Sequence, residues 1–189
     1  GVMTNNRFQF GVGVSTWYED FLATGERWEK RGKRMDEQID ILKGLMNGEY
    51  YSFKGEFYDI PELKLCPAPT KPVPILIGGH SKLALKRAAR VGDGWISAGI
   101  TLEETKEFIN QINTFREEFG TLDHPNYQFQ VMGEAAYSAD GIKNLEDLGA
   151  TEVIVAFRNA YEGGKDERTL DGMIAEINWY AEEVINKSK

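Results

Sequence analysis

Short apolar segments alternate with amphipathic, helix-like segments along most of this 189-residue chain. Strands buried on both faces of a parallel sheet are expected to be apolar throughout, and helices usually connect them. The pattern therefore predicts an α/β fold with helices covering a parallel sheet, and both an open doubly wound sheet and a barrel satisfy it. The predicted strands are residues 7–14, 74–79, 94–99, 127–138 and 151–157.

Apolar periodicity and capping residues predict five helices. They span about 26–46, 81–92 and 101–120, with a short one capped by Asp140 and a last one from about Thr169. Thr101 and Glu104 form the T-x-x-E pattern of a capping box. The side chains expected to be buried on the later helices are Phe108, Ile112, Phe115, Phe119, Ile142, Leu145, Leu148, Leu170, Met173, Ile177 and Val184.

The stretch YYSFKGEFYDI, residues 50–60, differs from the rest because aromatic and polar residues alternate around Lys54 and Gly55. This alternation is typical of a β-hairpin. We expect a two-stranded excursion outside the main sheet.

A glycine pair lies between the strand 74–79 and the helix that follows it. Gly78 and Gly79 carry no Cβ, so an oxyanion can approach the backbone closely. The first N–H groups of the helix lack internal partners, and the helix dipole favours negative charge there. Ser81 can cap the helix and donate a hydroxyl, and His80 can add a donor. These features predict a phosphate site, although a tight turn alone would also use such glycines.

Composition narrows the classes of partner. The net charge is -8, which argues against nucleic acid and anionic membranes as binding partners. The sequence has no apolar run long enough to span a membrane and a single cysteine, Cys66, so neither a disulfide framework nor a cysteine-based zinc site is expected. We expect a cytoplasmic protein that acts on a small molecule without a metal.

Other polar residues have simpler interpretations. His124 lies in a polar loop and Cys66 in a proline-rich connection, so surface and structural roles are expected for them. Asp93 is expected to fix the turn between a helix and a strand. Arg158 and Asn159 follow the strand 151–157, where Arg158 could reach a phosphate or an acidic substrate.

Several linked motifs resemble the luciferase-like monooxygenases, a superfamily of flavin- and deazaflavin-dependent oxidoreductases. They are RFQFGVGVSTWYEDF, RGKRMDEQIDILKGLMNGEYYSFKGEFYDIP, PAPTKPVPILIGGHS and RAARVGDGW. The resemblance implies a (β/α)8 barrel whose cofactor lies at the carboxyl ends of the strands. The cofactor would be FMN or the 8-hydroxy-5-deazaflavin coenzyme, and it would perform hydride transfer or oxygen activation on a small organic substrate.

The resemblance also assigns residues to the cofactor. It implies that Gly78, Gly79, His80 and Ser81 hold the cofactor phosphate. Gly11 and Gly13 would lie near the ring or the ribityl chain, although GVGVST does not match G-x-G-x-x-G. Arg34 occupies a helix position that contacts phosphate in some relatives, with a solvated helix charge as the alternative. No catalytic residue is assigned.

By this resemblance the segment beginning at Arg7 is the fourth barrel strand. We therefore expect residues 1–189 to be the carboxyl-terminal portion of one barrel domain, strands 4 to 8 with an inserted hairpin, without the first three βα units. Such a chain would expose open sheet edges, so we expect it to form a homo-oligomer and to be inactive alone. Two alternatives stay open: a non-catalytic half-barrel that binds a phosphorylated ligand or a partner chain, and a doubly wound nucleotide-binding protein.

Overall fold

The computed structural model describes residues 1–158, 164 and 166–188. The chain forms two compact units, residues 1–94 and 95–189, which are described separately. No helix in the described part of the chain has the length and apolar character needed to cross a membrane.

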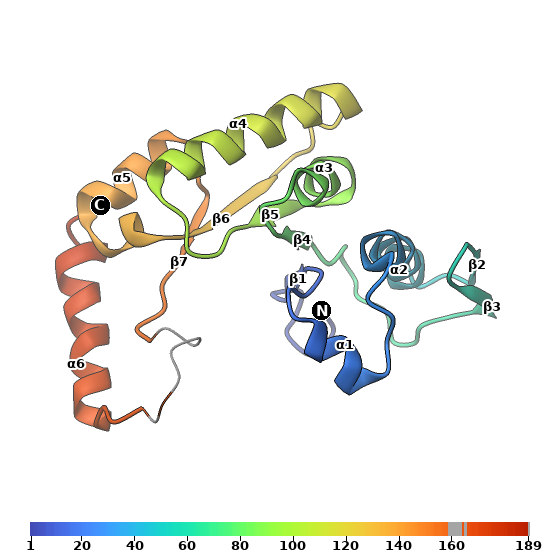
Figure 1. The fold of residues 1–189 in the computed structure, drawn as a ribbon, viewed down its shortest axis with the longest axis horizontal. Helices are drawn as coiled ribbons and strands as arrows, with labels where there is room; N and C mark the ends of the chain where they lie inside the picture. Colours follow the sequence, from blue (N-terminus) through green and yellow to red (C-terminus); the bar gives the residue numbers. More distant parts are fainter. Residues whose placement is uncertain (159–163, 165, 189) are drawn as a thin grey trace. The chain divides into compact units, whose positions relative to one another are not determined.

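The strands form one main sheet and one small ribbon (Figure 1). The main sheet has the order β1-β4-β5-β6-β7, and β1–β4 and β6–β7 pair in parallel. The predicted α/β class with a parallel sheet is therefore confirmed. Its strands are β1 (Phe10–Val12), β4 (Ile75–Gly78), β5 (Gly94–Ile96), β6 (Gln128–Met132) and β7 (Glu152–Ile154).

The helices follow the strands along the chain, as the alternation predicts. In the first unit they are α1 (Tyr18–Thr24), α2 (Arg31–Met46) and α3 (Lys82–Val91). In the second they are α4 (Leu102–Phe119), the short 3₁₀ helix η1 (Glu134–Tyr137), α5 (Ala139–Asp147) and α6 (Leu170–Tyr180), which continues as the π-helical turn η2 (Ala181–Ile185).

The unit from β4 through α3 follows the sequence prediction closely. Ile75, Leu76 and Ile77 are all buried, as expected for a strand covered on both faces. Helix α3 ends before Gly92, and Asp93 then ties the chain back to β4. Its carboxylate accepts from the Ile75 N–H at 2.8 Å, and its own N–H donates to the Ile75 carbonyl at 2.8 Å. The expected turn role of Asp93 is confirmed.

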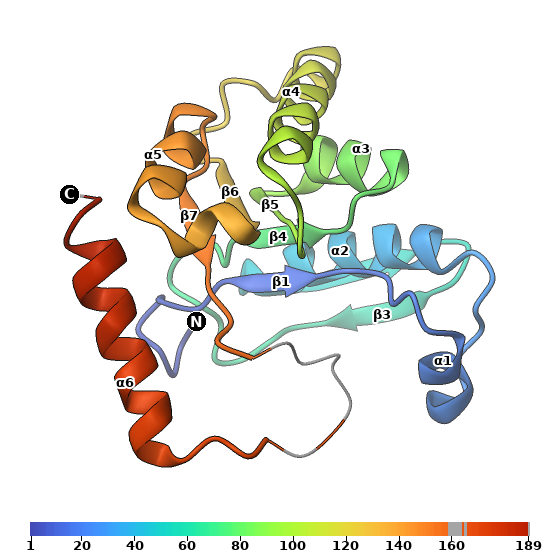
Figure 2. The ribbon, with the colours of Figure 1, turned by 60° about the vertical axis from the view of Figure 1, so that its left-hand side comes forward.

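The predicted hairpin is confirmed as a separate ribbon of β2 (Tyr51–Lys54) and β3 (Asp59–Leu63), which lies beside α2 (Figures 1 and 2). Glu37 on α2 anchors its turn. The Glu37 carboxylate accepts hydrogen bonds from the backbone N–H groups of Glu56, Phe57 and Tyr58, at 2.6, 3.0 and 3.1 Å. A Cβ at Gly55 would lie 2.4 Å from this carboxylate, so the contact requires glycine there.

A second anchor joins α2 to α3. Arg87 is buried, and its guanidinium donates to both carboxylate oxygens of Asp36, at 2.7 and 3.2 Å. It also donates to the Gly32 carbonyl at 2.9 Å. Arg90 donates to the same carboxylate at 3.1 Å. One aspartate therefore fixes α3 against α2 through two arginines.

In the second unit, the capping box at the start of α4 is confirmed. The Thr101 hydroxyl accepts from the Glu104 N–H at 3.2 Å, and the Glu104 carboxylate accepts from the Thr101 N–H at 2.8 Å. Gly120 ends the helix in the left-handed conformation, with φ 67°. Trp95 on β5 is fully buried and packs edge-on against Phe108 of α4.

Several boundaries predicted from the sequence are wrong, and the strands predicted over 94–99 and 151–157 end early, at Ile96 and Ile154. The helix predicted over 26–46 begins at Arg31 because Lys30 is left-handed, with φ 56°, and α1 was not predicted. The strand predicted over 7–14 is shorter, because only residues 10–12 pair. The strand predicted over 127–138 ends at Met132, and the segment after Gly133 coils into η1 beneath Tyr180, whose hydroxyl donates to the Ala136 carbonyl. Ser138, rather than Asp140, caps α5.

The predicted burial of α4 and α6 is partly wrong as well. Phe119 is 39% exposed, and on α6 Leu170 and Ile177 are 71% and 55% exposed. In both views α6 approaches the rest of its unit near its carboxyl end, beside α5 (Figures 1 and 2). Periodicity shows which residues share a helix face, but it does not say what covers that face.

Candidate functional site

The Gly78–Ser81 junction connects the carboxyl end of β4 to the amino end of α3. Gly79 has φ 117°, a conformation that side chains disfavour, and a Cβ there would lie 3.1 Å from the Ala84 Cβ. Both the backbone angle and the crowding therefore require glycine at this position. The chain turns sharply here, and the first residues of α3 follow at once.

Ser81 acts as the N-cap of α3. Its hydroxyl accepts from the Ala84 N–H at 3.2 Å, and its carbonyl accepts from the Leu85 N–H at 3.0 Å. The two preceding N–H groups, of Lys82 and Leu83, have no acceptor within the helix because they belong to its first turn. Together with the helix dipole they create a position that favours an oxyanion. His80 is half-buried beside it.

The ends of β1 and β4 lie side by side at this junction. A Cβ at Gly13 would lie 3.7 Å from the Gly78 carbonyl oxygen, and one at Gly78 would lie 3.6 Å from the Val12 carbonyl oxygen. These are ordinary contact distances, so packing within the chain does not require glycine at either position. The absence of both side chains leaves the edge of the sheet accessible to a ligand. Gly11 lies inside β1, paired with Leu76.

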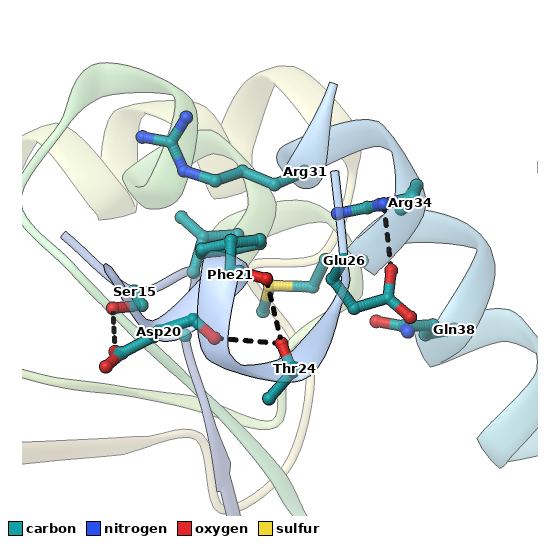
Figure 3. Close-up of a pocket in the computed structure, with 11 residues that line it drawn as sticks. Ser15, Asp20, Phe21, Thr24, Glu26, Arg31, Arg34 and Gln38 are labelled. Atoms are coloured by element: carbon teal, nitrogen blue, oxygen red, sulfur yellow. Dashed lines mark hydrogen bonds and ion pairs between the residues drawn. The ribbon is translucent and has the colours of Figure 1, made fainter. Parts of the chain in front are cut away.

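A pocket of ≈ 340 Å³ opens beside Gly13, and we call it the β1–α2 pocket (Figure 3). Its walls come from the end of β1, from α1 and from the start of α2. The lining residues are Gly13, Val14, Ser15, Asp20, Phe21, Thr24, Glu26, Arg31, Arg34, Met35 and Gln38. Of the residues proposed from the sequence, the structure thus brings Gly13 and Arg34 into one pocket, with Gly78 against Gly13.

Arg34 is not the solvated helix charge that was one expectation from the sequence. Its side chain is only 13% exposed, and it donates to the Glu26 carboxylate at 3.0 Å and to the Arg27 carbonyl. Figure 3 shows the Arg34 guanidinium turned toward Glu26. Its charge is therefore already used to hold the segment before α2.

Arg31 lines the same pocket and was missed in the sequence. Its guanidinium stacks on the Trp28 ring, with 3.5 Å between the guanidinium carbon and the ring centroid. Its Nε is buried and has no hydrogen-bond partner in the part of the chain that the structure describes. The sequence feature that could have identified Arg31 is its spacing of three residues from Arg34, which places both arginines on one face of α2.

The other polar candidates lie outside this pocket. Cys66 is exposed, and the backbone N–H of His124 donates to the Thr121 carbonyl in a turn. Arg158 donates to the Gly164 carbonyl at 2.9 Å and lies 3.8 Å from the Asp166 carboxylate. Hydrogen bonds from Arg168, and the positive charges nearby, hold the pKa of Asp166 well below its usual value. Asn159 lies outside the described residues.

Sequence comparison identifies relatives of two cofactor types. The chain is 45% identical over 185 residues to an uncharacterized protein of Mycobacterium tuberculosis, covering 98% of this chain and 63% of that protein. It is 33% identical to an FMNH(2)-dependent dimethylsulfone monooxygenase of Pseudomonas fluorescens, over 58% of this chain and 31% of that protein. It is 30% identical to an F420-dependent glucose-6-phosphate dehydrogenase of Amycolatopsis mediterranei, over 50% of this chain and 29% of that protein.

Among solved structures, the coenzyme F420 dependent tetrahydromethanopterin reductase from Methanopyrus kandleri superposes with a TM-score of 0.70. The match covers 96% of this chain and 74% of that chain at 12% sequence identity, so it supports the fold alone. It confirms the predicted fold, part of a (β/α)8 barrel with an inserted hairpin.

The family comparison covers almost all of the first compact unit and about half of the second. The sequence model described as luciferase-like monooxygenase matches residues 2–140. This range includes the Gly78–Ser81 junction, the β1–α2 pocket and the hairpin that were described above. The chain therefore belongs to the luciferase-like monooxygenase family.

Proposed function

We propose that the protein is an oxidoreductase that uses FMN or the deazaflavin F420 and acts on a small organic substrate. The observation that carries this proposal is the Gly78–Ser81 junction, where a left-handed glycine precedes an N-capped helix. The two cofactors share a ribityl phosphate. Both cofactor types occur among the relatives of this chain.

The site fits such a phosphate on three counts. Gly79 lets the chain turn without a side chain, the N–H groups at the start of α3 point to the anion, and the Ser81 hydroxyl fixes the first turn. The space beside Gly13 and Gly78 would accept the adjoining chain of the cofactor. Gly11 lies two residues before Gly13, inside β1 and paired with Leu76, so it adds no direct contact to this placement.

The cofactor would supply the hydride or the activated oxygen, and this chain would supply binding and orientation. The junction holds the phosphate end, so that the ring is directed along the carboxyl edge of the sheet. Arg34 has a structural role in this proposal, because its ion pair with Glu26 fixes one wall of the β1–α2 pocket. In this proposal His80 shields the phosphate from water.

Equilibrium titration of the full-length protein with FMN, F420 and riboflavin tests the proposal. We expect FMN or F420 to bind, and riboflavin, which lacks the phosphate, to bind at least about tenfold more weakly than FMN if FMN is the ligand. If neither phosphorylated cofactor binds, the proposed function is wrong. If FMN and riboflavin bind equally well, the phosphate site is misplaced.

A further inference from the structure

Helix α6 carries an apolar face that the described residues leave uncovered. Leu170, Ile174 and Ile177 recur at spacings of four and three residues, so they share one side of the helix. All three are exposed, and so is Ile185 of η2. Burying one such side chain contributes about 1.5–3 kcal/mol, and a row of them on a protein surface marks a contact with another segment.

The strand β7 leaves one edge of the main sheet open. It is the last strand in the order β1-β4-β5-β6-β7, and among the described residues it pairs with β6 alone. An open edge with half-buried apolar residues pairs readily with a further strand. A cavity of ≈ 300 Å³ is lined by Val153 and Val155 and also by Ile185, so the edge and the helix face adjoin. We call the open edge of β7 and the apolar face of α6 and η2 together the β7–α6 surface.

The β7–α6 surface is acidic. The charged residues of β7, α6 and η2 are all carboxylates: Glu152, Asp171, Glu176, Glu182 and Glu183. Arg168 pairs with Glu176, and Lys187 pairs with Glu183. The other three form no ion pair with any residue that the structure describes. A segment that covers this surface therefore needs positive charge as well as apolar side chains.

Glu152 shows where one of these positive charges belongs. It is the first residue of β7 and lies opposite Gln130 of β6, whose side-chain amide donates to the Glu152 carboxylate at 2.8 Å. Gln130 is buried, so the carboxylate lies at the border of the core, on the open edge of the sheet. A strand added to this edge would remove the carboxylate from water, and a buried carboxylate requires a cationic partner.

Charge also selects the occupant. A second copy of this chain would bring a molecule of net charge -8 against an acidic surface, and like charges at a contact are unfavourable. Chain outside residues 1–189 is the better candidate. The Mycobacterium tuberculosis protein that is 45% identical to this chain extends beyond the match, which covers 63% of it.

We propose that a segment of the full-length chain outside residues 1–189 covers the β7–α6 surface, adding a strand to β7 and placing a lysine or arginine against Glu152. The covering segment is apolar on the side that meets Leu170, Ile174 and Ile177. The inference concerns the amino end of β7 and the outer helix, so it does not depend on the proposed function.

Thiol labelling of the full-length protein tests the cover on α6. The exposed Cys66 is first replaced by serine, and Ile177→Cys then places a thiol on the apolar face. Ala175→Cys is the matched control, because Ala175 is an exposed residue of the same helix that points away from this face. The rate of reaction with a maleimide is measured for both variants at several protein concentrations, and again in urea.

We expect the thiol of Ile177→Cys to react at least about tenfold more slowly than that of Ala175→Cys, at every protein concentration. In urea the two rates should become equal. Equal rates in the folded protein would overturn the inference. Protection that grows with protein concentration would also overturn it, because a second copy would then be the occupant.

Glu152→Gln tests the charge, because glutamine keeps a carbonyl oxygen for the Gln130 amide and removes only the negative charge. Glu118→Gln, at an exposed carboxylate of α4, makes the same change in net charge elsewhere. We expect Glu152→Gln to lower the midpoint of urea unfolding of the full-length protein by about 0.5 M or more, and Glu118→Gln by less than about 0.2 M. Equal midpoints for the two variants would exclude a cation paired with Glu152.

Discussion

Replacing Gly79 with valine is expected to lower the affinity for the phosphorylated cofactor by about a hundredfold or more. Gly79 has φ 117°, and a Cβ would lie 3.1 Å from the Ala84 Cβ in the first turn of α3. A β-branched residue cannot hold this angle without strain, so the turn and the N–H groups beyond it must shift. Fluorescence titration with FMN or F420 measures the loss.

Two further variants separate the site from general strain. Gly78→Ala places its Cβ 3.6 Å from the Val12 carbonyl oxygen, a normal contact, so the fold should persist while the methyl group obstructs the ligand. Gly120→Val introduces a similar backbone conflict at φ 67° at the end of α4, away from the junction. We expect Gly78→Ala to lower the affinity for the cofactor. We expect Gly120→Val to lower the stability of the fold and to leave the affinity unchanged. Unchanged affinity in Gly79→Val and Gly78→Ala would exclude the junction as the phosphate site.

Replacing Asp36 with alanine is expected to destabilise the fold by about 2–3 kcal/mol. Arg87 is buried, and its guanidinium loses both of its bonds to the carboxylate, at 2.7 and 3.2 Å. The charge then keeps only the Gly32 carbonyl as a partner among the contacts described above. Because Asp36 is 30% exposed, water offsets part of the loss and keeps it below that of a fully buried pair.

Urea unfolding of the full-length protein measures this effect, with Arg90→Ala as the control. Arg90 binds the same carboxylate at 3.1 Å, but its side chain is 50% exposed, so its removal should cost less than about 1 kcal/mol. Equal losses for the two variants would show that burial of Arg87 does not govern the anchor between α2 and α3.

The parts of the fold set by local chemistry were predictable from the sequence. The capping box at Thr101, the Ser81 cap and the hairpin around Gly55 each depend on residues that are close in the chain. The Gly78–Ser81 junction was visible for the same reason, since a glycine pair followed by an N-cap is a local pattern. Its role in binding stays a prediction.

The features that were missed depend on residues distant in sequence or on unusual backbone angles. Helix α1 and the late start of α2 follow from the left-handed conformations of Gly25 and Lys30, which apolar periodicity does not report. Arg31 and Arg34 look equivalent in the sequence, and only the fold shows that Glu26 pairs with one of them. The absence of the first three βα units, the homo-oligomer, the cytoplasmic location and the inactivity of the isolated chain stay predictions.

A crystal structure of the full-length protein with FMN or F420 tests the central claim most directly. The account predicts a phosphate oxygen about 3 Å from a backbone nitrogen in the first turn of α3, at Lys82 or Leu83. It also predicts that the chain next to the phosphate passes Gly13 and Gly78. A phosphate bound elsewhere, with the start of α3 facing solvent, would contradict the account.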